Sequence, residues 1–158
     1  MHLNRIFPVA LAFACVPVWA GTVEVRFAEP ERYSDAGATR AEQAGNLEEL
    51  ARHLERLAQR LPPDHVLRVE VLDVDLAGTQ IGLSPRVVNN AGDLPRLHLR
   101  YSVNAGNRVL AAGEDHLTRL DYARTMRSAR SSTPLFDEKR LLDDWFAQRI
   151  AGPAHAAR

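Results

Sequence analysis

The spacing of the apolar residues changes along this chain, and this change most constrains the possible folds. Apolar residues alternate with polar ones near residue 23, recur at helical spacing after residue 46, and alternate again after residues 66 and 97. Alternation is typical of a strand with one buried face, and the longer period is typical of an amphipathic helix. The pattern predicts an α+β two-layer sandwich, with an approximately four-stranded mixed sheet and two helices on one face, in the order β-α-β-β-β-α.

The first strand and the first helix are predicted from short local signals. Alternation covers residues 23–27, whereas residues 31–45 show neither period and are expected to form a surface connection. Asn46 followed by Glu49 resembles a capping box, and Pro62 ends the helix. The expected buried stripe of this helix is Leu47, Leu50, Ala51, Leu54, Leu57, Ala58 and Leu61.

The strand predicted over residues 66–76 changes its apolar phase halfway along. One phase holds Leu67, Val69 and Val71, and the other holds Leu72, Val74 and Leu76. A change of phase reverses the faces of a strand unless a bulge or bend absorbs it. We therefore expect an irregularity near Val71 and Leu72, followed by a loop over residues 77–95.

A hairpin is predicted from the two alternating runs that flank residues 104–107. If the turn occupies these four residues, Tyr101 lies opposite Leu110, and Arg96 lies opposite Asp115. The outer face of the hairpin would then carry Arg96, Arg100 and Asp115.

A second helix is expected near the C-terminus. Thr133 and Pro134 suit the cap and the first helical position, and Gly152 with Pro153 ends the helix, leaving residues 152–158 as a frayed tail. The expected buried stripe is Leu135, Leu141, Leu142, Trp145, Phe146 and Ile150.

Residues 1–20 have the pattern of a cleaved signal peptide. A short charged start precedes an apolar run over residues 6–19, and Ala20 with Val18 suits a signal-peptidase site. The run contains two prolines and is too short to span a bilayer, so no transmembrane segment is expected in the mature chain. We expect a periplasmic or secreted protein with a single domain over residues 21–151.

Cys15 is the only cysteine, and it lies inside the segment expected to be removed. The mature chain would therefore form neither a disulfide nor a thiolate metal site. Lipid anchoring through Cys15 is disfavoured, because Ala12 replaces the usual leucine and Phe13 is bulky.

The charge of the expected mature chain is close to neutral. The full chain has 20 basic and 20 acidic residues, and removal of residues 1–20 takes away Arg5 and no acid. A near-neutral domain gives no electrostatic reason to expect nucleic acid as a partner.

Two aspartates at the end of the third predicted element are candidate metal ligands. Asp73 and Asp75 begin like a calcium loop, but Ala77 stands where a third oxygen ligand belongs and Ser84 replaces the final glutamate. A strand end whose acids bond to a turn explains the same pattern. Together with Glu114, these two residues form the candidate site for a weakly bound divalent cation.

Glu114, Asp115 and His116 place two acids and an imidazole side by side, which could support proton transfer or a metal. Alternation sends Asp115 to the opposite face, where pairing with Arg96 is expected, and it leaves Glu114 at the edge of the core. No catalytic motif is present, so no catalytic residue is assigned. The other histidines of the expected domain are scattered: His53, His65 and His98.

An arginine-rich segment follows the hairpin and is a candidate for anion binding. Guanidinium groups bind phosphate with two hydrogen bonds, although runs of this kind are often only solvated. The candidate residues are Arg119, Arg124, Arg127 and Arg130.

Four blocks of the chain together resemble a bacterial family of exported proteins, domain of unknown function 3016. The blocks are Val23–Asp35, Val69–Gly78, Leu94–Tyr122 and Leu135–Phe146. The resemblance implies one exported domain. The family name implies no biochemical role, so no functional residue is carried over.

Three functional hypotheses remain open on the sequence. The leading one is a non-catalytic envelope protein that binds a protein or an anionic ligand through its loops and its arginine-rich segment. The second is a hydrolase or divalent-metal-dependent protein centred on Asp73, Asp75 and Glu114. The third is a passive structural component of the envelope.

Overall fold

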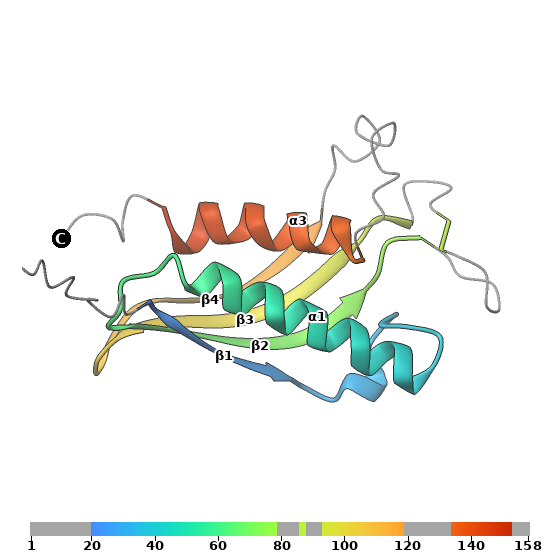
Figure 1. Ribbon diagram of the computed structural model, residues 1–158, viewed down its shortest axis with the longest axis horizontal. Coiled ribbons are helices and arrows are strands. Elements are labelled where there is room, and N and C mark those ends of the chain that lie inside the picture. The colour runs from blue at the N-terminus through green and yellow to red at the C-terminus, as the bar shows by residue number, and fades with distance from the viewer. Residues whose placement is uncertain (1–19, 79–85, 88–92, 119–133, 153–158) are drawn as a thin grey trace, which may run out of the picture.

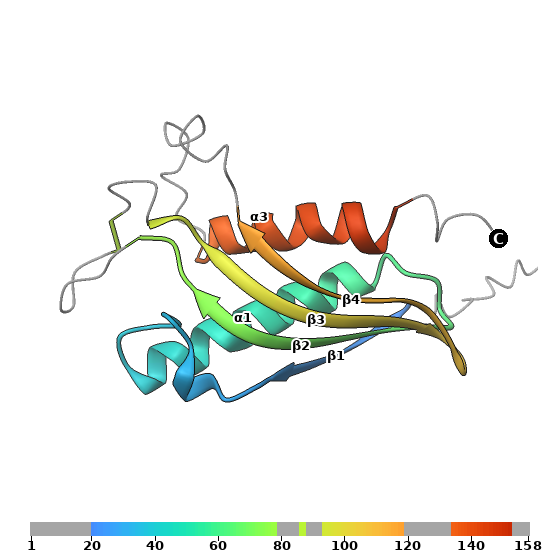
Figure 2. The same cartoon turned by 180° about the vertical axis from the view of Figure 1, so that it is seen from behind.

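The computed structural model describes residues 20–78, 86–87, 93–118 and 134–152. Two helices cover one face of a four-stranded sheet, as both views show (Figures 1 and 2). The predicted fold class and the order β-α-β-β-β-α are therefore confirmed. The main elements are β1 (Thr22–Phe27), α1 (Arg40–Ala58), β2 (His65–Asp75), β3 (Arg96–Ala105), β4 (Arg108–Thr118) and α3 (Phe136–Trp145).

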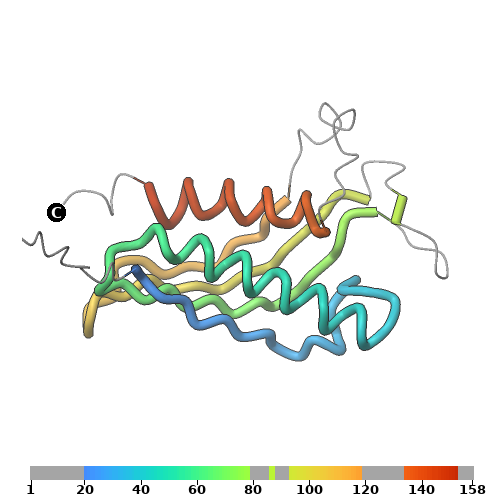
Figure 3. Tube along the Cα trace, in the orientation of Figure 1, coloured from blue at the N-terminus to red at the C-terminus, as the bar shows by residue number. Residues whose placement is uncertain are grey.

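The strands lie in the order β1-β2-β3-β4, and the sheet is mixed as predicted. β1 runs parallel to β2, while the pairs β2–β3 and β3–β4 are antiparallel. The chain reaches β2 from β1 through α1, which packs on the sheet as the trace in Figure 3 shows. Within the described residues, no helix is both long enough and apolar enough to cross a membrane.

The expected irregularity in β2 is confirmed, because the register with β3 shifts between Val71 and Asp73. The carbonyl of Val71 accepts hydrogen bonds from the backbone N–H of Ala28, at 2.9 Å, and from the hydroxyl of Tyr33, at 2.8 Å. Burial raises the pKa of Tyr33 to about 12, so this hydroxyl stays protonated and remains a donor.

One hydrophobic core fills the space between the helices and the sheet. The predicted stripes of both helices supply much of it, and β2 and β3 contribute alternate residues. The most deeply buried large side chains, each less than 2% exposed, include Phe146, Leu54, Leu67, Leu99, Leu142 and Ile150.

Helix α1 begins seven residues earlier than the sequence pattern indicated, because its cap is Thr39 and not Asn46. Thr39 caps the helix by accepting a hydrogen bond from the N–H of Glu42 at 3.1 Å, and the Glu42 carboxylate accepts from the N–H of Ala38 at 3.0 Å. The expectation of a surface connection over residues 31–45 is therefore wrong in its second half. Thr39 and Glu42 form a variant of the capping box, in which the glutamate accepts from the residue before the cap, and the apolar periodicity did not mark it.

The hairpin turn is shorter than predicted, which changes the register of β3 and β4. β3 extends to Ala105 and β4 begins at Arg108, so only two residues connect the strands. The register of the pair also shifts between Val103 and Asn104. Tyr101 pairs with Gly113 and not with Leu110. The pairing of β4 with β3 is displaced by three residues from the predicted pairing. Because three is an odd number, this displacement exchanges the two faces of β4.

The last helix has a different start from the one predicted. Leu135, with a φ of 51°, precedes α3 in the left-handed conformation, and Pro134 lies before the helix; Thr133 lies outside the described residues. The predicted stripe is buried from Leu141 to Ile150, with a π-helical turn, η3, over Phe146–Ile150. The expected end at Gly152 and Pro153 coincides with the limit of the described residues, and most of the predicted tail lies beyond it.

Glu138 is buried on α3, although no apolar pattern predicts it there. Its carboxylate accepts a hydrogen bond from the N–H of Ala77 at 2.7 Å. Burial raises the pKa of Glu138 above its ordinary 4.5, because the charged form loses its hydration. The stability contributed by the protonated form is complete below the unfolded pKa and is lost as pH rises through the folded pKa.

Replacement of Glu138 by glutamine is therefore expected to raise Tm at pH 7 and to change it little at pH 4. Glutamine keeps an oxygen that can accept the hydrogen bond from Ala77, but it carries no charge. Thermal unfolding followed by circular dichroism at several pH values tests this expectation. A variant less stable than the wild type at pH 7 would contradict it.

Candidate functional site

The face of the sheet opposite the helices carries a dense set of charged side chains. Strand alternation sends Val23, Val25 and Phe27 toward the helices and leaves the residues between them on the uncovered face. The same alternation applies to the other three strands. Six ionisable side chains on this face line an open trough: Glu24, Arg26, Arg68, Glu70, Arg100 and Glu114.

The trough has a volume of about 820 Å³ and takes residues from all four strands. Ser102 and Ala112, which are partners across β3 and β4, line it between the charged groups. These two short side chains leave space over the sheet that longer ones would fill. The small residues therefore form the floor of the trough, and the charged residues form its walls.

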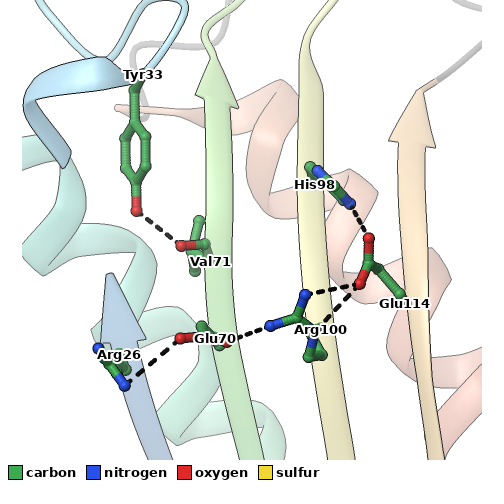
Figure 4. A network of polar contacts seen from close by, with 7 residues as sticks. All are labelled: Arg26, Tyr33, Glu70, Val71, His98, Arg100 and Glu114. Carbon is green, nitrogen blue, oxygen red and sulfur yellow. Dashed lines mark hydrogen bonds and ion pairs between the residues drawn. The ribbon is translucent and has the colours of Figure 1, made fainter. Parts of the chain in front are cut away.

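The charged residues form a ladder of ion pairs across the four strands (Figure 4). Arg26 on β1 lies 3.6 Å from Glu70 on β2, which accepts from Arg100 on β3 at 2.9 Å. Arg100 also donates to Glu114 on β4, at 3.1 Å. A separate pair joins Glu24 and Arg68 at 2.8 Å. The two signs of charge alternate, so the ladder is nearly neutral.

Glu114 stands at the end of the ladder and has two donors. The ring Nε2 of His98 lies 2.8 Å from one carboxylate oxygen, and the Arg100 guanidinium contacts the other (Figure 4). These two hydrogen bonds hold the pKa of Glu114 below its ordinary value, and Glu114 in turn raises the pKa of Arg100. Glu114 is therefore an anion at neutral pH.

A compact set of possible metal ligands lies beside the ladder. The ligand atoms of His98, Glu114 and His116 all lie within 4.8 Å of one another, and no other set of three or more qualifies within the described residues. The two imidazole rings stack with centroids 3.7 Å apart and planes 20° apart. Two imidazoles and one carboxylate are ligands that suit divalent transition metals.

The structure does not bring Asp73, Asp75 and Glu114 together into such a set. Asp73 accepts from the N–H of Ser34 at 2.7 Å and from its hydroxyl at 2.8 Å. Asp75 accepts from Arg96 at 2.8 Å. The two aspartates thus have the turn and strand contacts that the sequence offered as the alternative to a metal site.

The faces expected for Glu114 and Asp115 are exchanged in the structure. Glu114 lies on the uncovered face, whereas Asp115 points toward α3 and accepts from the indole N–H of Trp145 at 3.1 Å. The expected pair between Asp115 and Arg96 is therefore wrong. With the observed register, residues 98 and 116 are direct partners, which the predicted turn of residues 104–107 had hidden.

Two parts of the predicted site lie outside the described residues. The proposed anion-binding residues fall within the segment 119–133, and Ser84 falls within the segment 79–85. Of the loop predicted over residues 77–95, the structure describes residues 77–78, 86–87 and 93–95. The uncovered face of the sheet is therefore the candidate site that the described residues define.

Comparison with known proteins identifies one family. No curated protein and no solved structure matches the chain. A family described as "Protein of unknown function (DUF3016)" matches residues 21–148, which is most of the chain and includes β1 to β4, α1 and α3 of the described residues. The chain belongs to this family.

Proposed function

We propose that this protein is a non-catalytic binding module of the bacterial cell envelope, and that it binds a protein partner on the uncovered face of its sheet. The trough that all four strands line carries this proposal. Exposure alone would not mark a site, because an antiparallel sheet commonly leaves one face in water. A hollow walled by six ionisable side chains is a more specific feature, since such groups select partners by electrostatic complementarity.

The balance of charge in the trough favours a protein over a simple anion. Arg26, Arg68 and Arg100 each contact a glutamate. A free phosphate or carboxylate would have to displace a glutamate to bind one of these arginines. A protein surface that carries both signs can instead exchange partners with both members of each pair, so the face keeps its charges compensated in the complex.

Export is part of the proposal and has two supports besides the sequence of residues 1–20. The family match begins at residue 21, directly after the expected cleavage site. Residue 21 itself is part of the domain, because the N–H of Gly21 donates to the carbonyl of Leu61 at 3.1 Å. A Cβ atom at position 21 would lie only 2.6 Å from the Leu61 Cβ, so this position requires glycine.

Site-specific photocrosslinking in the native host tests the proposed binding face. A photoreactive amino acid at Ser102 or Ala112 lies in the trough, whereas one at Glu48 or Glu55 lies on the exposed side of α1. We expect the trough positions to crosslink one discrete protein and the α1 positions to give no such product.

A charge reversal provides the second measurement. Arg68→Glu, in the trough, should reduce the crosslink from Ala112 by at least tenfold, which corresponds to about 1.4 kcal/mol. Arg52→Glu, on α1, is the matched control and should leave it unchanged. Absence of a discrete product, as for a passive structural component, would contradict the proposal, and so would capture of anionic lipid alone.

A further inference from the structure

We propose that His98, Glu114 and His116 form a binding site for one divalent transition-metal ion, for which Zn²⁺ is the appropriate probe. The site lies at the β3–β4 side of the uncovered face. It differs from the aspartate-centred site that the sequence indicated, and it goes beyond the proposed function, because metal binding can be measured without any protein partner.

The register of β3 and β4 creates this site. His98 and His116 are direct partners across the two strands, and Glu114 lies two residues before His116 on the same face. The three ligand atoms lie within 4.8 Å of one another. Ligand atoms around a tetrahedral Zn²⁺ are roughly 3.3 Å apart, given metal–ligand bonds of about 2.0–2.1 Å. Side-chain rotation can supply the remaining contraction without moving the strands.

Solvent exposure gives the side chains room to rotate and gives an ion access to them. The side chain of His98 is 25% exposed and that of Glu114 is 43% exposed, and His116 is also exposed. The stacked rings already place both imidazoles on one side of the sheet. To coordinate one ion, the rings must turn from this parallel arrangement so that their lone pairs converge on it.

The donor set selects the class of ion. Neutral imidazole suits Zn²⁺, Cu²⁺ and Ni²⁺, whereas Ca²⁺ and Mg²⁺ prefer shells of oxygen. Three protein ligands leave a fourth position for water, as in zinc sites with two histidines and a glutamate. The anionic Glu114 supplies one negative charge, and binding an ion would replace its hydrogen bond with His98.

Arg100 lies beside the site and should weaken it. Its guanidinium contacts Glu114 at 3.1 Å, so it places a positive charge near the ion and competes for the carboxylate. Replacement of Arg100 by glutamine removes both effects. This variant should therefore bind Zn²⁺ more tightly than the wild type, which is the opposite of the effect expected from general damage to the sheet.

Isothermal titration of the purified, metal-free protein with Zn²⁺ tests the proposal. We expect one ion per chain, at least tenfold weaker binding in His98→Gln, His116→Gln and Glu114→Gln, and at least threefold tighter binding in Arg100→Gln. The matched control is His65→Gln, because His65 also contacts a carboxylate, that of Asp64 at 2.8 Å, but lies outside the cluster. Its affinity should equal that of the wild type.

Circular dichroism of each metal-free variant provides the control for folding. Because Arg100→Gln is expected to gain affinity, its result stays informative even if one of the ligand variants fails to fold. The absence of a stoichiometric site in the wild type would overturn the proposal, as would equal binding in the folded ligand variants. Weaker binding in a folded Arg100→Gln variant would also overturn it. None of these outcomes bears on the protein partner, which the crosslinks from Ser102 and Ala112 test separately.

Discussion

Replacement of Phe146 by alanine is expected to lower the free energy of unfolding by about 3–5 kcal/mol, the usual cost of removing a buried phenylalanine. The Phe146 side chain is fully buried, at the junction of α3 and the π-helical turn that follows it. A domain of this size has a total stability of about 5–15 kcal/mol. The substitution should therefore remove a large part of that stability.

Chemical denaturation in urea measures this loss, and Phe136→Ala is the matched control. Phe136 begins the same helix but is only partly buried, with the Arg140 guanidinium 5.7 Å from its ring. The control should cost clearly less than Phe146→Ala, with an unchanged dependence on urea concentration. Equal losses in the two variants would show that Phe146 is not in the core.

The Phe146 prediction depends on a part of the fold that local patterns define well. Leu141, Leu142, Trp145, Phe146 and Ile150 recur at helical spacing, and all five are buried in the structure. The same kind of pattern located the irregularity near Leu72, since a strand cannot change its apolar phase without a bulge. Element type, order and the buried side of each helix are consequences of such periods.

The candidate site was harder to predict because it depends on register. Moving the hairpin turn by a few residues changes which side of β4 faces the helices, and apolar alternation in β4 is weak. Leu110 and Ala112 suggested one face for Glu114, while the two-residue connection after Ala105 gives it the other. The pairing of His98 with His116 follows only once that register is known.

The sequence pattern also did not predict which charged residues are buried or paired between the helices. Lys139 is nearly buried and donates to Glu49 on α1 at 2.6 Å, which links the two helices. Neither residue belongs to an apolar stripe, so periodicity places both in solvent. Such a pair can be found only after the helices are known to pack side by side, because its members are 90 residues apart.

Replacement of Trp145 by alanine should cost about 3–5 kcal/mol of unfolding free energy, an effect comparable to that at Phe146. The Trp145 side chain is 3% exposed and packs edge-on against Tyr101, with ring centroids 5.3 Å apart. Its N–H donates to Asp115. Trp145→Phe keeps most of the apolar contact and removes only the donor, so it should cost about 1–3 kcal/mol.

A double-mutant cycle on Asp115 then decides which face of β4 meets the helices. If Asp115 faces α3, Trp145→Phe and Asp115→Ala should couple by at least about 0.5 kcal/mol, because each removes one partner of the same hydrogen bond. Arg96→Ala and Asp115→Ala should instead be additive, because Arg96 contacts Asp75 on the uncovered face. Coupling between Arg96 and Asp115 would instead show that β3 and β4 pair in the predicted register. Glu114 would then lie on the opposite face from His98, and the proposed metal site would have no basis.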